Sequence, residues 1–538
     1  MTSVAMQPAV RDQEWDQARF LVGRAREVLA HDEASLRRLD DLDARLREPL
    51  RVALAGRVKT GKSTLLNALI GEEIAPTDTG ECTRLVTWYL FGEAPAVHAV
   101  LRSGTRTPLP IHTVHGALRL DVDGIPPRLI DHLEVRWPSP LLRRMTLIDT
   151  PGLASLSAEL GERSLGLLTP ARGQSGIDAM LYLVRHLHAE DVAVLRDFQQ
   201  ASGAAEQNAA MTLCLLSRAD EVGGGRIDAL LSAGQVADRL RTDPDMRSLC
   251  LDVLPVAGLL GQGGRSLRQR DFAALRDLAG LGRERREDLL LSADRFINTE
   301  VPEVPHLTPQ ERATVLQRLG VFGVRLSTVL LRDGFNTATA LSDELFRRSG
   351  LGPVTSVILD QLDRRSQALR GRSVLLALDA LLAEGAANAE PVRAAIARAQ
   401  SRNQHADELA LLSRVRHDPP EGLTADEIAQ ATVVLGSRGL SAQDRLGPGA
   451  WSCESGTAGV EVAALLRTWR QRLADPESSA TILDLAAQVI RSAERTLVEL
   501  SEACPPRPVA EPASDSSMAP TRAQSRRASK ARRGARRR

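Results

Sequence analysis

The residues with the clearest chemical meaning lie at positions 56–63, where Gly-Arg-Val-Lys-Thr-Gly-Lys-Ser fits the pattern G-x-x-x-x-G-K-[ST]. Two glycines at this spacing let the backbone turn with its N–H groups pointing inward, so that the loop can surround phosphate oxygens. Lys62 would reach the β- and γ-phosphates of a nucleotide, and the Ser63 hydroxyl would hold Mg²⁺. The nucleotide-contacting residues expected in this loop are Gly56, Val58, Lys59, Thr60, Gly61, Lys62, Ser63 and Thr64.

The residues around this loop support the prediction. Residues 51–55, Arg-Val-Ala-Leu-Ala, are typical of a short buried strand, and residues 64–70, Thr-Leu-Leu-Asn-Ala-Leu-Ile, are typical of a helix. The N-terminus of a helix carries a partial positive charge, so a helix that begins here would attract a bound phosphate. The alternative is an ordinary strand–turn–helix that binds no nucleotide.

A second motif lies at the end of another predicted strand, where residues 149–152 read Asp-Thr-Pro-Gly and fit D-x-x-G. Open α/β sheets bind ligands at the carboxyl ends of their strands, so this position suits a nucleotide site. Asp149 would contact Mg²⁺ through a water molecule. The backbone N–H of Gly152 would meet the γ-phosphate and so respond to its hydrolysis.

A third motif follows the predicted buried strand at 211–216 and reads Ser-Arg-Ala-Asp, similar to the [NT]-K-x-D base-reading motif of GTPases. A carboxylate at Asp220 can accept both the N1–H and the exocyclic amine of guanine, which adenine does not offer. The stem of Arg218 can lie over the base as the usual lysine does, whereas Ser217 should brace the loop less well than Asn or Thr. A polar turn after a strand is the alternative. Together with the end of the last predicted strand, where a backbone N–H would meet the guanine O6, the base-contacting residues expected are Ser217, Arg218, Asp220, Ala257 and Gly258.

These motifs, in this order, resemble the dynamin superfamily of large GTPases, and within it bacterial dynamin-like proteins of the mycobacterial isoniazid-inducible kind. The resemblance is carried by G-R-V-K-T-G-K-S-T-L-L-N-A-L at 56–69, C-T-R at 82–84, L-I-D-T-P-G at 147–152 and L-S-R-A-D-E at 216–221. By motif order, Thr83 matches the threonine that closes on Mg²⁺ and positions the attacking water, with Thr79 as the alternative. The resemblance implies GTP and Mg²⁺ as cofactors, and hydrolysis of GTP to GDP and phosphate. It implies metal ligation by Ser63, Thr83 and Asp149.

Lys59 occupies the loop position two residues before Gly61. Some large GTPases related to dynamins place an arginine there, and charge supplied to the phosphates accelerates hydrolysis by roughly 10³–10⁵ in GTPases. We therefore expect Lys59 to act on the phosphates once two GTPase domains pair; the alternative is a lysine that faces solvent. The catalytic residues expected are Lys59, Lys62, Thr83 and Gly152.

The resemblance and the helical periodicity together predict the fold class and four segments. The fold expected is an α/β P-loop GTPase domain, with a mostly parallel sheet and helices on both faces, plus an elongated all-α helical bundle. Residues 1–48 should form an N-terminal helix that packs into the helical neck, 49–305 the GTPase domain, 306–503 the helical trunk and neck, and 504–538 a disordered basic tail. The N-terminal helix is expected as one rod over 10–48, with the apolar stripe of 478–503 as its partner.

Composition and charge limit the classes of function that this sequence is compatible with. The chain is 43% hydrophobic with a net charge of +1, and its five cysteines are scattered, as in a reduced intracellular protein. No signal peptide or transmembrane helix is predicted, so a cytoplasmic protein, peripheral on the inner face of the cell membrane, is expected. The sequence shows no constellation of Ser, Cys or His nucleophiles, which excludes chemistry other than phosphate hydrolysis.

The resemblance implies nucleotide-driven self-association and membrane remodelling, through a homodimer of GTPase domains and possible hetero-assembly with a paralogue. Nine Lys and Arg residues in 521–538 could bind an anionic lipid surface or nucleic acid. The alternative function is therefore an RNA- or ribosome-associated P-loop GTPase that uses this tail. For lipid contact, the loop around Leu440, Leu446 and Trp451 is favoured, with 351–357 as the second choice.

Overall fold

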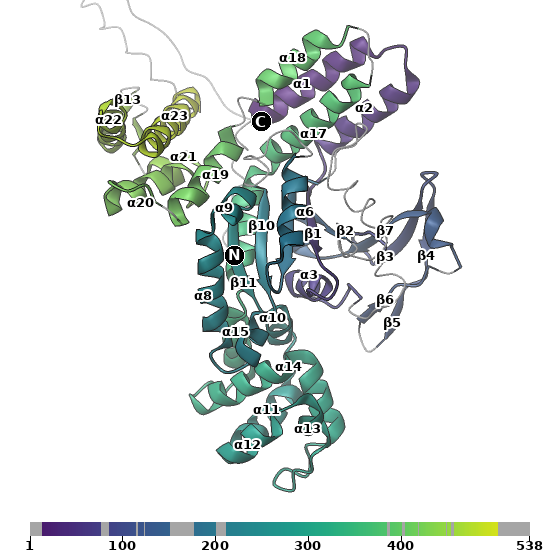
Figure 1. Cartoon of the computed structure of the whole chain (residues 1–538). Coiled ribbons are helices and arrows are strands. Elements are labelled where there is room, and N and C mark those ends of the chain that lie inside the picture. The colour runs from purple at the N-terminus through teal and green to yellow at the C-terminus, as the bar shows by residue number, and fades with distance from the viewer. Residues whose placement is uncertain are drawn as a thin grey trace, which may run out of the picture.

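The structure is a computed structural model. It describes residues 13–76, 85–114, 117–122, 124–150, 177–200, 211–384, 388–400, 404–417, 419–447, 449–452 and 457–503. A central sheet lies between three groups of helices: one lobe at the lower end of the strands in Figure 1, and two separate groups at the upper end. The predicted fold class is confirmed, and its helical part is divided into these separate groups.

The main sheet has nine strands in the order β11-β10-β9-β1-β8-β2-β7-β3-β4. The five strands from β11 to β8 are parallel, β2 is antiparallel to β8 and parallel to β7, and β3 is antiparallel to both of its neighbours. Their bounds are β1 Leu50–Gly56, β2 Thr87–Phe91, β3 Ala96–Leu101, β4 Arg106–Leu109, β7 Ile130–Trp137, β8 Met145–Asp149, β9 Ala179–Val184, β10 Thr212–Ser217 and β11 Asp252–Val256. Two short hairpins join β5 His112–Val114 to β6 Ala117–Arg119, and β12 Trp451–Ser452 to β13 Thr457–Ala458.

Both faces of the parallel half are buried, because successive side chains of a strand point to opposite faces. In β1, Ala53 and Ala55 belong to one hydrophobic cluster, whereas Val52 and Leu54 belong to another. The first face is covered by α6 Ala189–Gln200, α8 Ala229–Thr242 and α9 Pro244–Leu249, and the second by α3 Lys62–Ile70, α16 Leu351–Ser356 and the π-helix η4 Val357–Leu362.

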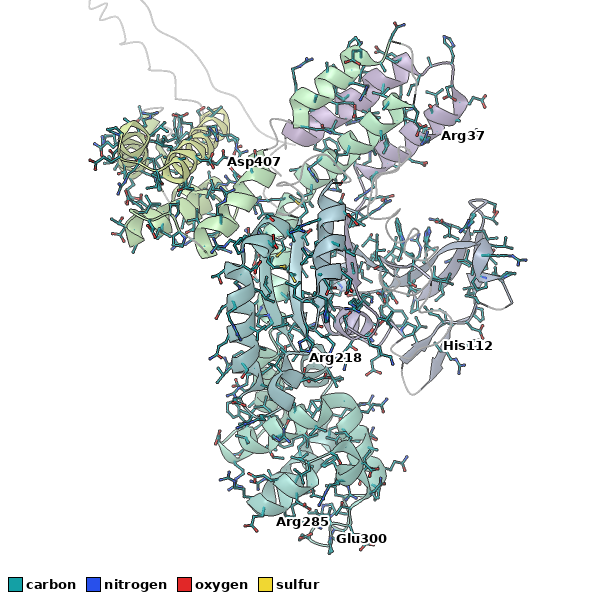
Figure 2. All side chains as sticks on the ribbon, in the orientation of Figure 1. Arg37, His112, Arg218, Arg285, Glu300 and Asp407 are labelled. Carbon is teal, nitrogen blue, oxygen red and sulfur yellow. The ribbon has the colours of Figure 1, made fainter. Side chains whose placement is uncertain are left out.

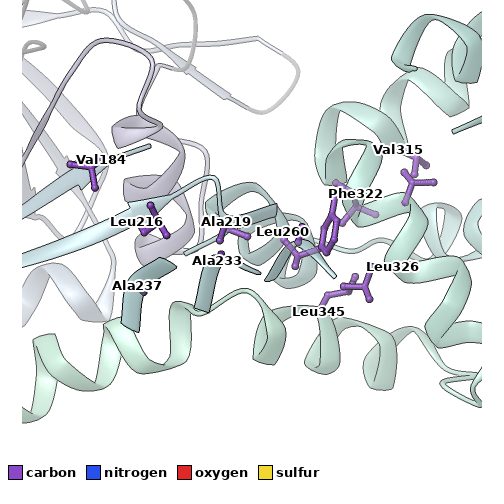
Figure 3. Packing of buried hydrophobic residues seen from close by; sticks show 14 of the residues in the cluster. Val184, Leu216, Ala219, Ala233, Ala237, Leu260, Val315, Phe322, Leu326 and Leu345 are labelled. Atoms are coloured by element: carbon purple, nitrogen blue, oxygen red, sulfur yellow. The ribbon is translucent and has the colours of Figure 1, made fainter. Parts of the chain in front are cut away.

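The lower lobe continues the first cluster beyond the sheet. Buried side chains run from Val184 and Leu216 through Leu260 to Phe322 and Leu326 (Figure 3). The helices are α10 Gly258–Arg265, α11 Gln269–Gly280, α12 Arg283–Leu289, α13 Ala293–Asn298, α14 Pro309–Arg332 and α15 Ala338–Arg348.

Helix α14 begins with a capping box in which Thr308 and Glu311 exchange hydrogen bonds, and it is interrupted at Gly320, whose φ is 67°. Among the described helices, α14 alone is long and apolar enough, by length and composition, to cross a membrane. In its most apolar window 56% is buried inside the protein. A core helix of a water-soluble protein passes the same test, so this helix is weak evidence for a membrane span.

The N-terminal segment differs from its prediction. The expected single rod is two helices, α1 Gln13–Val28 and α2 Glu33–Arg45, which contact each other. The break follows from Asp32, whose carboxylate accepts hydrogen bonds from the Ala34 N–H at 3.0 Å and the Ser35 hydroxyl at 2.5 Å. An aspartate that caps the first turn of a new helix ends the previous one, since the N-cap backbone is not helical.

The predicted partner of this segment is also wrong. Helices α1 and α2 share a hydrophobic cluster with α17 Ser366–Ala383 and α18 Glu390–Gln400. The C-terminal helix α23 Ala480–Ala503 packs instead with α19 Gln404–His417, α20 Ala425–Val434, α21 Ala442–Leu446 and α22 Val460–Ala474. Several helices carry an apolar stripe of the same period, and the period alone does not specify which two stripes meet.

A buried ion pair attaches α2 to the sheet. The guanidinium of Arg45 donates to the carboxylate of Asp178, immediately before β9, and their side chains are 2% and 0% exposed. The same carboxylate accepts the backbone N–H of Arg51 in β1 at 2.7 Å. One carboxylate therefore joins the N-terminal helices to two central strands.

We predict that Asp178→Ala strongly destabilises the protein, because it removes the fully buried partner of Arg45 and leaves only the half-exposed Glu48 carboxylate, 3.9 Å away, at a cost of about 3–5 kcal/mol. The shift of the denaturant midpoint would measure this cost. Asp43→Ala is the matched control: it breaks the Arg47–Asp43 pair (2.7 Å) on the outer surface of the same helix, where a pair contributes only about 0–1 kcal/mol. Equal shifts in the two variants would contradict the prediction.

Candidate nucleotide-binding site

The phosphate-binding loop connects β1 to α3 at the carboxyl edge of the sheet. Gly56 has a φ of 138°, and a Cβ built there would lie 2.4 Å from the Leu183 carbonyl oxygen, so no side chain fits between these strands. Gly61 caps α3 with a φ of 92°, a conformation that favours glycine. The two glycines of the motif are thus required by a close backbone approach and by a left-handed turn.

Lys62, Ser63 and Asp149 meet at the start of α3. The Nζ of Lys62 donates to the carbonyl oxygens of Gly56 and Arg57, each at 3.1 Å, and the Ser63 hydroxyl donates to Asp149 Oδ2 at 3.2 Å. Burial lowers the pKa of Lys62 and raises the pKa of Asp149, while the attraction between the two charges acts against both shifts. Two ionisable groups whose charged forms are disfavoured by burial are typical of a functional site.

The residues present fit a bound Mg²⁺. Asp149 Oδ1 is buried and has no hydrogen-bond partner among the described residues. A hydroxyl and a carboxylate oxygen are the hard oxygen donors that Mg²⁺ prefers, and this ion is commonly held by one or two protein oxygens plus the phosphates of its substrate. Ser63 and Asp149 would hold the ion. When bound, it would neutralise charge on the β- and γ-phosphate oxygens.

Beside the loop lies a pocket that is open to solvent. It combines residues from the phosphate-binding loop, the end of β10 and the start of α10. Its lining residues are Thr60, Gly61, Thr64, Leu65, Leu183, Ser217, Arg218, Asp220, Glu221, Val256, Gly258 and Leu259. The structure therefore brings the first and third sequence motifs to one cavity.

The structure places all three residues of the predicted base-reading motif, Ser217, Arg218 and Asp220, at the pocket. The Ser217 hydroxyl donates to the Val184 carbonyl oxygen at 3.0 Å, so it braces the loop to the neighbouring strand more firmly than the sequence predicted. Arg218 has a left-handed backbone (φ 53°) and lies at the lower end of the strands in Figure 2. Burial raises the pKa of Asp220, whose side chain lines the pocket.

One predicted contact needs correction. The backbone N–H of Ala257 donates to the Ser349 carbonyl oxygen at 2.8 Å, and Ala257 does not line the pocket, so it is not placed to meet a guanine O6. Gly258, the first residue of α10, does line the pocket. A segment more than 90 residues away in the chain takes the Ala257 N–H, which no local pattern could indicate.

The other predicted residues fall into two groups. Val58 and Lys59 are exposed on the outer part of the loop and do not line the pocket, and Lys59 has a left-handed backbone (φ 64°). Thr83, its alternative Thr79, and Gly152 lie outside the described residues. Their roles stay predictions.

The sequence did not identify two residues beside the base-reading motif: Glu221, which lines the pocket, and Arg185, which contacts Glu221 but does not line the pocket. Glu221 directly follows the base-reading motif, so its position next to Asp220 in the sequence could have identified it as a site residue. No sequence signal could have identified Arg185, because only the parallel pairing of β9 with β10 brings the end of β9 to this edge. Its guanidinium donates to Glu221 at 2.6 Å.

The fold and the motif positions define a P-loop GTPase. A family model described as the dynamin family matches residues 52–218. The isoniazid-induced protein IniC of Mycobacterium tuberculosis is 41% identical over 467 residues, which cover 86% of this chain and 93% of IniC. The chain therefore belongs to the dynamin family.

Two further similarities are partial. The isoniazid-induced protein IniA of Mycobacterium tuberculosis is 34% identical over 142 residues, which cover 25% of this chain and 22% of IniA. A solved structure of an oligomerised bacterial dynamin pair, described as providing a mechanism for the long-range sensing and tethering of membranes, covers 93% of this chain and 75% of that chain at 13% identity. The TM-score of this match is 0.29.

We predict that Asp220→Asn weakens GTP binding at least about tenfold and lowers the preference for GTP over ATP, because an ionised acceptor of two hydrogen bonds is lost. In the wild type, GTP affinity should fall on acidification at a higher pH than an ordinary aspartate would give, since burial raises the pKa of Asp220 and its protonated form accepts poorly. The variant should lack this pH dependence. Titration calorimetry with GTP and ATP across pH would measure both effects. Equal affinity of the wild type for GTP and ATP would defeat the assignment.

Proposed function

We propose that the protein is a Mg²⁺-dependent GTP hydrolase that associates with itself through its GTPase domains and binds and remodels membranes. The observation that carries the first part is the convergence of three motifs at one sheet edge. Lys62, Ser63 and Asp149 supply the phosphate and metal end, and Asp220 supplies the base end of the adjoining pocket. Membership of the dynamin family supports the same reading.

The phosphate end derives its chemistry from charge and orientation. The Lys62 ammonium lies beside the loop carbonyls, where it can meet the negative charge that grows on the phosphates during transfer. The helix α3 begins at the same point and directs its first N–H groups to that site. We propose GTPase-domain pairing as the event that adds Lys59 to this charge.

We also propose residues 49–305 as the GTPase domain, flanked by the N-terminal helical segment, the helical region 306–503 and the basic tail. The cluster in Figure 3 continues from the sheet into α14, so the proposed division at 305 passes through packed side chains. Assembly with a paralogue is included because two different isoniazid-induced proteins, IniC and IniA, resemble this chain.

Of the predicted lipid-contact residues, Leu446, Leu351 and Val354 are wrong, whereas Leu440 and Trp451 are half-buried and their contact with lipid stays a prediction. Leu446 is 8% exposed and packs in the core of the C-terminal helical group, and in the alternative segment Leu351 and Val354 are 1% and 0% exposed. These side chains fill cores and cannot also enter a lipid surface. The proposal of membrane contact, and of a peripheral location on the inner face of the cell membrane, therefore rests on the basic segment 521–538.

We predict that the full-length protein sediments with vesicles that contain anionic lipid, and that it does so more in GTP than without nucleotide. Replacing the nine basic residues of 521–538 with glutamine should abolish the preference for anionic over neutral vesicles, since each contributes about 1 kcal/mol near such a surface. Lys62→Ala is the control that keeps the tail but should lose the nucleotide response. Unchanged sedimentation of the glutamine variant would contradict the tail as lipid contact, and binding of RNA in preference to vesicles would favour the alternative function.

We further predict that Lys59→Ala keeps GTP affinity within a few-fold but lowers assembly-stimulated turnover at least about tenfold, which corresponds to about 1.4 kcal/mol of barrier. Steady-state hydrolysis over a range of protein concentrations would show the loss. Val58→Ala, at the adjacent exposed position, is the matched control and should hydrolyse GTP like the wild type. Stimulated turnover of Lys59→Ala equal to that of wild type would rule the role out.

A further inference from the structure

A carboxylate joins two arginines at the base end of the pocket. The carboxylate oxygens of Glu221 accept a hydrogen bond from Arg218 at 2.7 Å and another from Arg185 at 2.6 Å. Arg218 comes from the motif after β10, whereas Arg185 comes from the end of β9. Because the two arginines belong to different strands, their common acceptor fixes both relative to the sheet.

The backbone reinforces this arrangement. The N–H of Glu221 donates to the Arg218 carbonyl oxygen at 2.9 Å, which closes the first turn of the 3₁₀-helix η3 Ala219–Gly224. Arg218 caps that turn in a left-handed conformation (φ 53°, ψ 43°), which a side-chain-bearing residue adopts only when its surroundings impose it. Glu221 thus holds Arg218 through its backbone and through its side chain.

The charges at this end of the pocket balance when Arg185, which pairs with Glu221 but does not line the pocket, is included. Asp220 and Glu221 are acidic, and Arg185 and Arg218 are basic. A guanine ring is neutral, so a site without net charge suits it, whereas the phosphate end carries Lys59 and Lys62. Burial is the main factor that raises the pKa of Asp220; the charge of Glu221 raises it further and that of Arg218 lowers it.

The exposure of these ion pairs limits what they contribute to folding stability. The side chains of Arg185, Glu221 and Arg218 are 43%, 44% and 38% exposed, and pairs at such exposure contribute little to folding. The ion pairs can still act by holding the Arg218 side chain in one orientation. An arginine that is already held in its bound rotamer loses less conformational entropy when a ligand arrives.

We propose that Glu221 is a positioning residue for guanine recognition, which holds Arg218 over the place of the base ring and uses Arg185 as its second anchor. This inference rests on the proposed GTP-binding function. It extends that function by assigning a role to Glu221 and Arg185, two residues that the sequence did not identify as site residues. Glu221 acts through Arg218 and leaves the hydrogen bonds to the guanine edge to Asp220.

The test is Glu221→Gln in the full-length protein, titrated with GTP, with inosine triphosphate, which lacks the exocyclic amine, and with ATP. Loss of the ring platform should weaken GTP and inosine triphosphate by the same factor, about three- to tenfold. The KM for GTP should rise with kcat unchanged, because platform contacts are made equally in the ground state and the transition state. A changed ratio of GTP to inosine triphosphate affinity would show that Glu221 acts on Asp220 instead, and would overturn the proposal.

Two further variants separate position from charge. Glu221→Asp keeps the charge but shortens the reach, so it should weaken GTP as Glu221→Gln does; wild-type affinity in this variant would overturn the positioning role. In an Arg218→Met background, Glu221→Gln should add no further loss, since residues that act as one unit are not additive. Additive losses would likewise overturn the proposal.

The matched control is Asp245→Asn, which breaks the Arg196–Asp245 pair (2.9 Å), an ion pair of similar exposure between α6 and α9. It should bind all three nucleotides like the wild type; a loss equal to that of Glu221→Gln would show a general effect of surface charge and overturn the proposal. If the wild type itself binds GTP no better than ATP, the proposed function fails. If it prefers GTP and Glu221→Gln behaves identically, the positioning role alone fails.

Discussion

A buried carboxylate must be paired, and in this protein that constraint is met at the amino-terminal edge of the sheet by Asp178. Its partners are the guanidinium of Arg45 and the backbone N–H of Arg51. Two central strands and the N-terminal helices converge on this one group. The sheet behind it is covered by helices on both faces.

The opposite edge of the sheet is built differently. Asp149 and Asp178 each have one buried oxygen without a partner among the described residues, and at the carboxyl ends of the strands burial raises the pKa of the acids Asp149 and Asp220. Buried acids whose ionised form is disfavoured lower the stability of the free protein, and a ligand that supplies a cation or hydrogen-bond donors relieves that cost. At the amino ends of the strands the buried carboxylate of Asp178 is paired with a cation of the protein itself, whereas Asp149 and Asp220 at the carboxyl ends suit a ligand that supplies a cation or hydrogen-bond donors.

One helical run contacts both edges. It begins after Ser349, whose carbonyl oxygen accepts the Ala257 N–H beside the base pocket, and it crosses the second face of the sheet through α16, η4 and η5 Asp363–Arg365. At the far edge, in α17, Arg370 donates to the Glu48 carbonyl oxygen and Ser373 lies 3.5 Å from that of Ile177. The π-helical turn in its middle is a rare element that is often found at functional sites.

The local chemistry of the site was predictable from sequence. The spacing of Gly56, Gly61 and Lys62 indicated a phosphate-binding loop, and the structure places that loop between a buried strand and a helix, as predicted. Ser217, Arg218 and Asp220 were identified in the same way, because a short motif after an apolar strand fixes where its side chains emerge. Each of these predictions depends on residues within a few positions of one another.

Contacts between distant segments were decided only by the tertiary structure. The apolar period of residues 10–48 predicted helix but not the turn capped by Asp32 or the pairing with α17. The same limit explains Leu446, whose apolar side chain fills a core, and Ala257, whose N–H is taken by Ser349. Sequence by itself determined which residues are apolar, charged or able to turn, since these are properties of single side chains and short spacings. Which apolar faces meet, and which charges such as Arg185 and Glu221 become neighbours, depends on strand order and on long-range packing, and only the folded chain decides them.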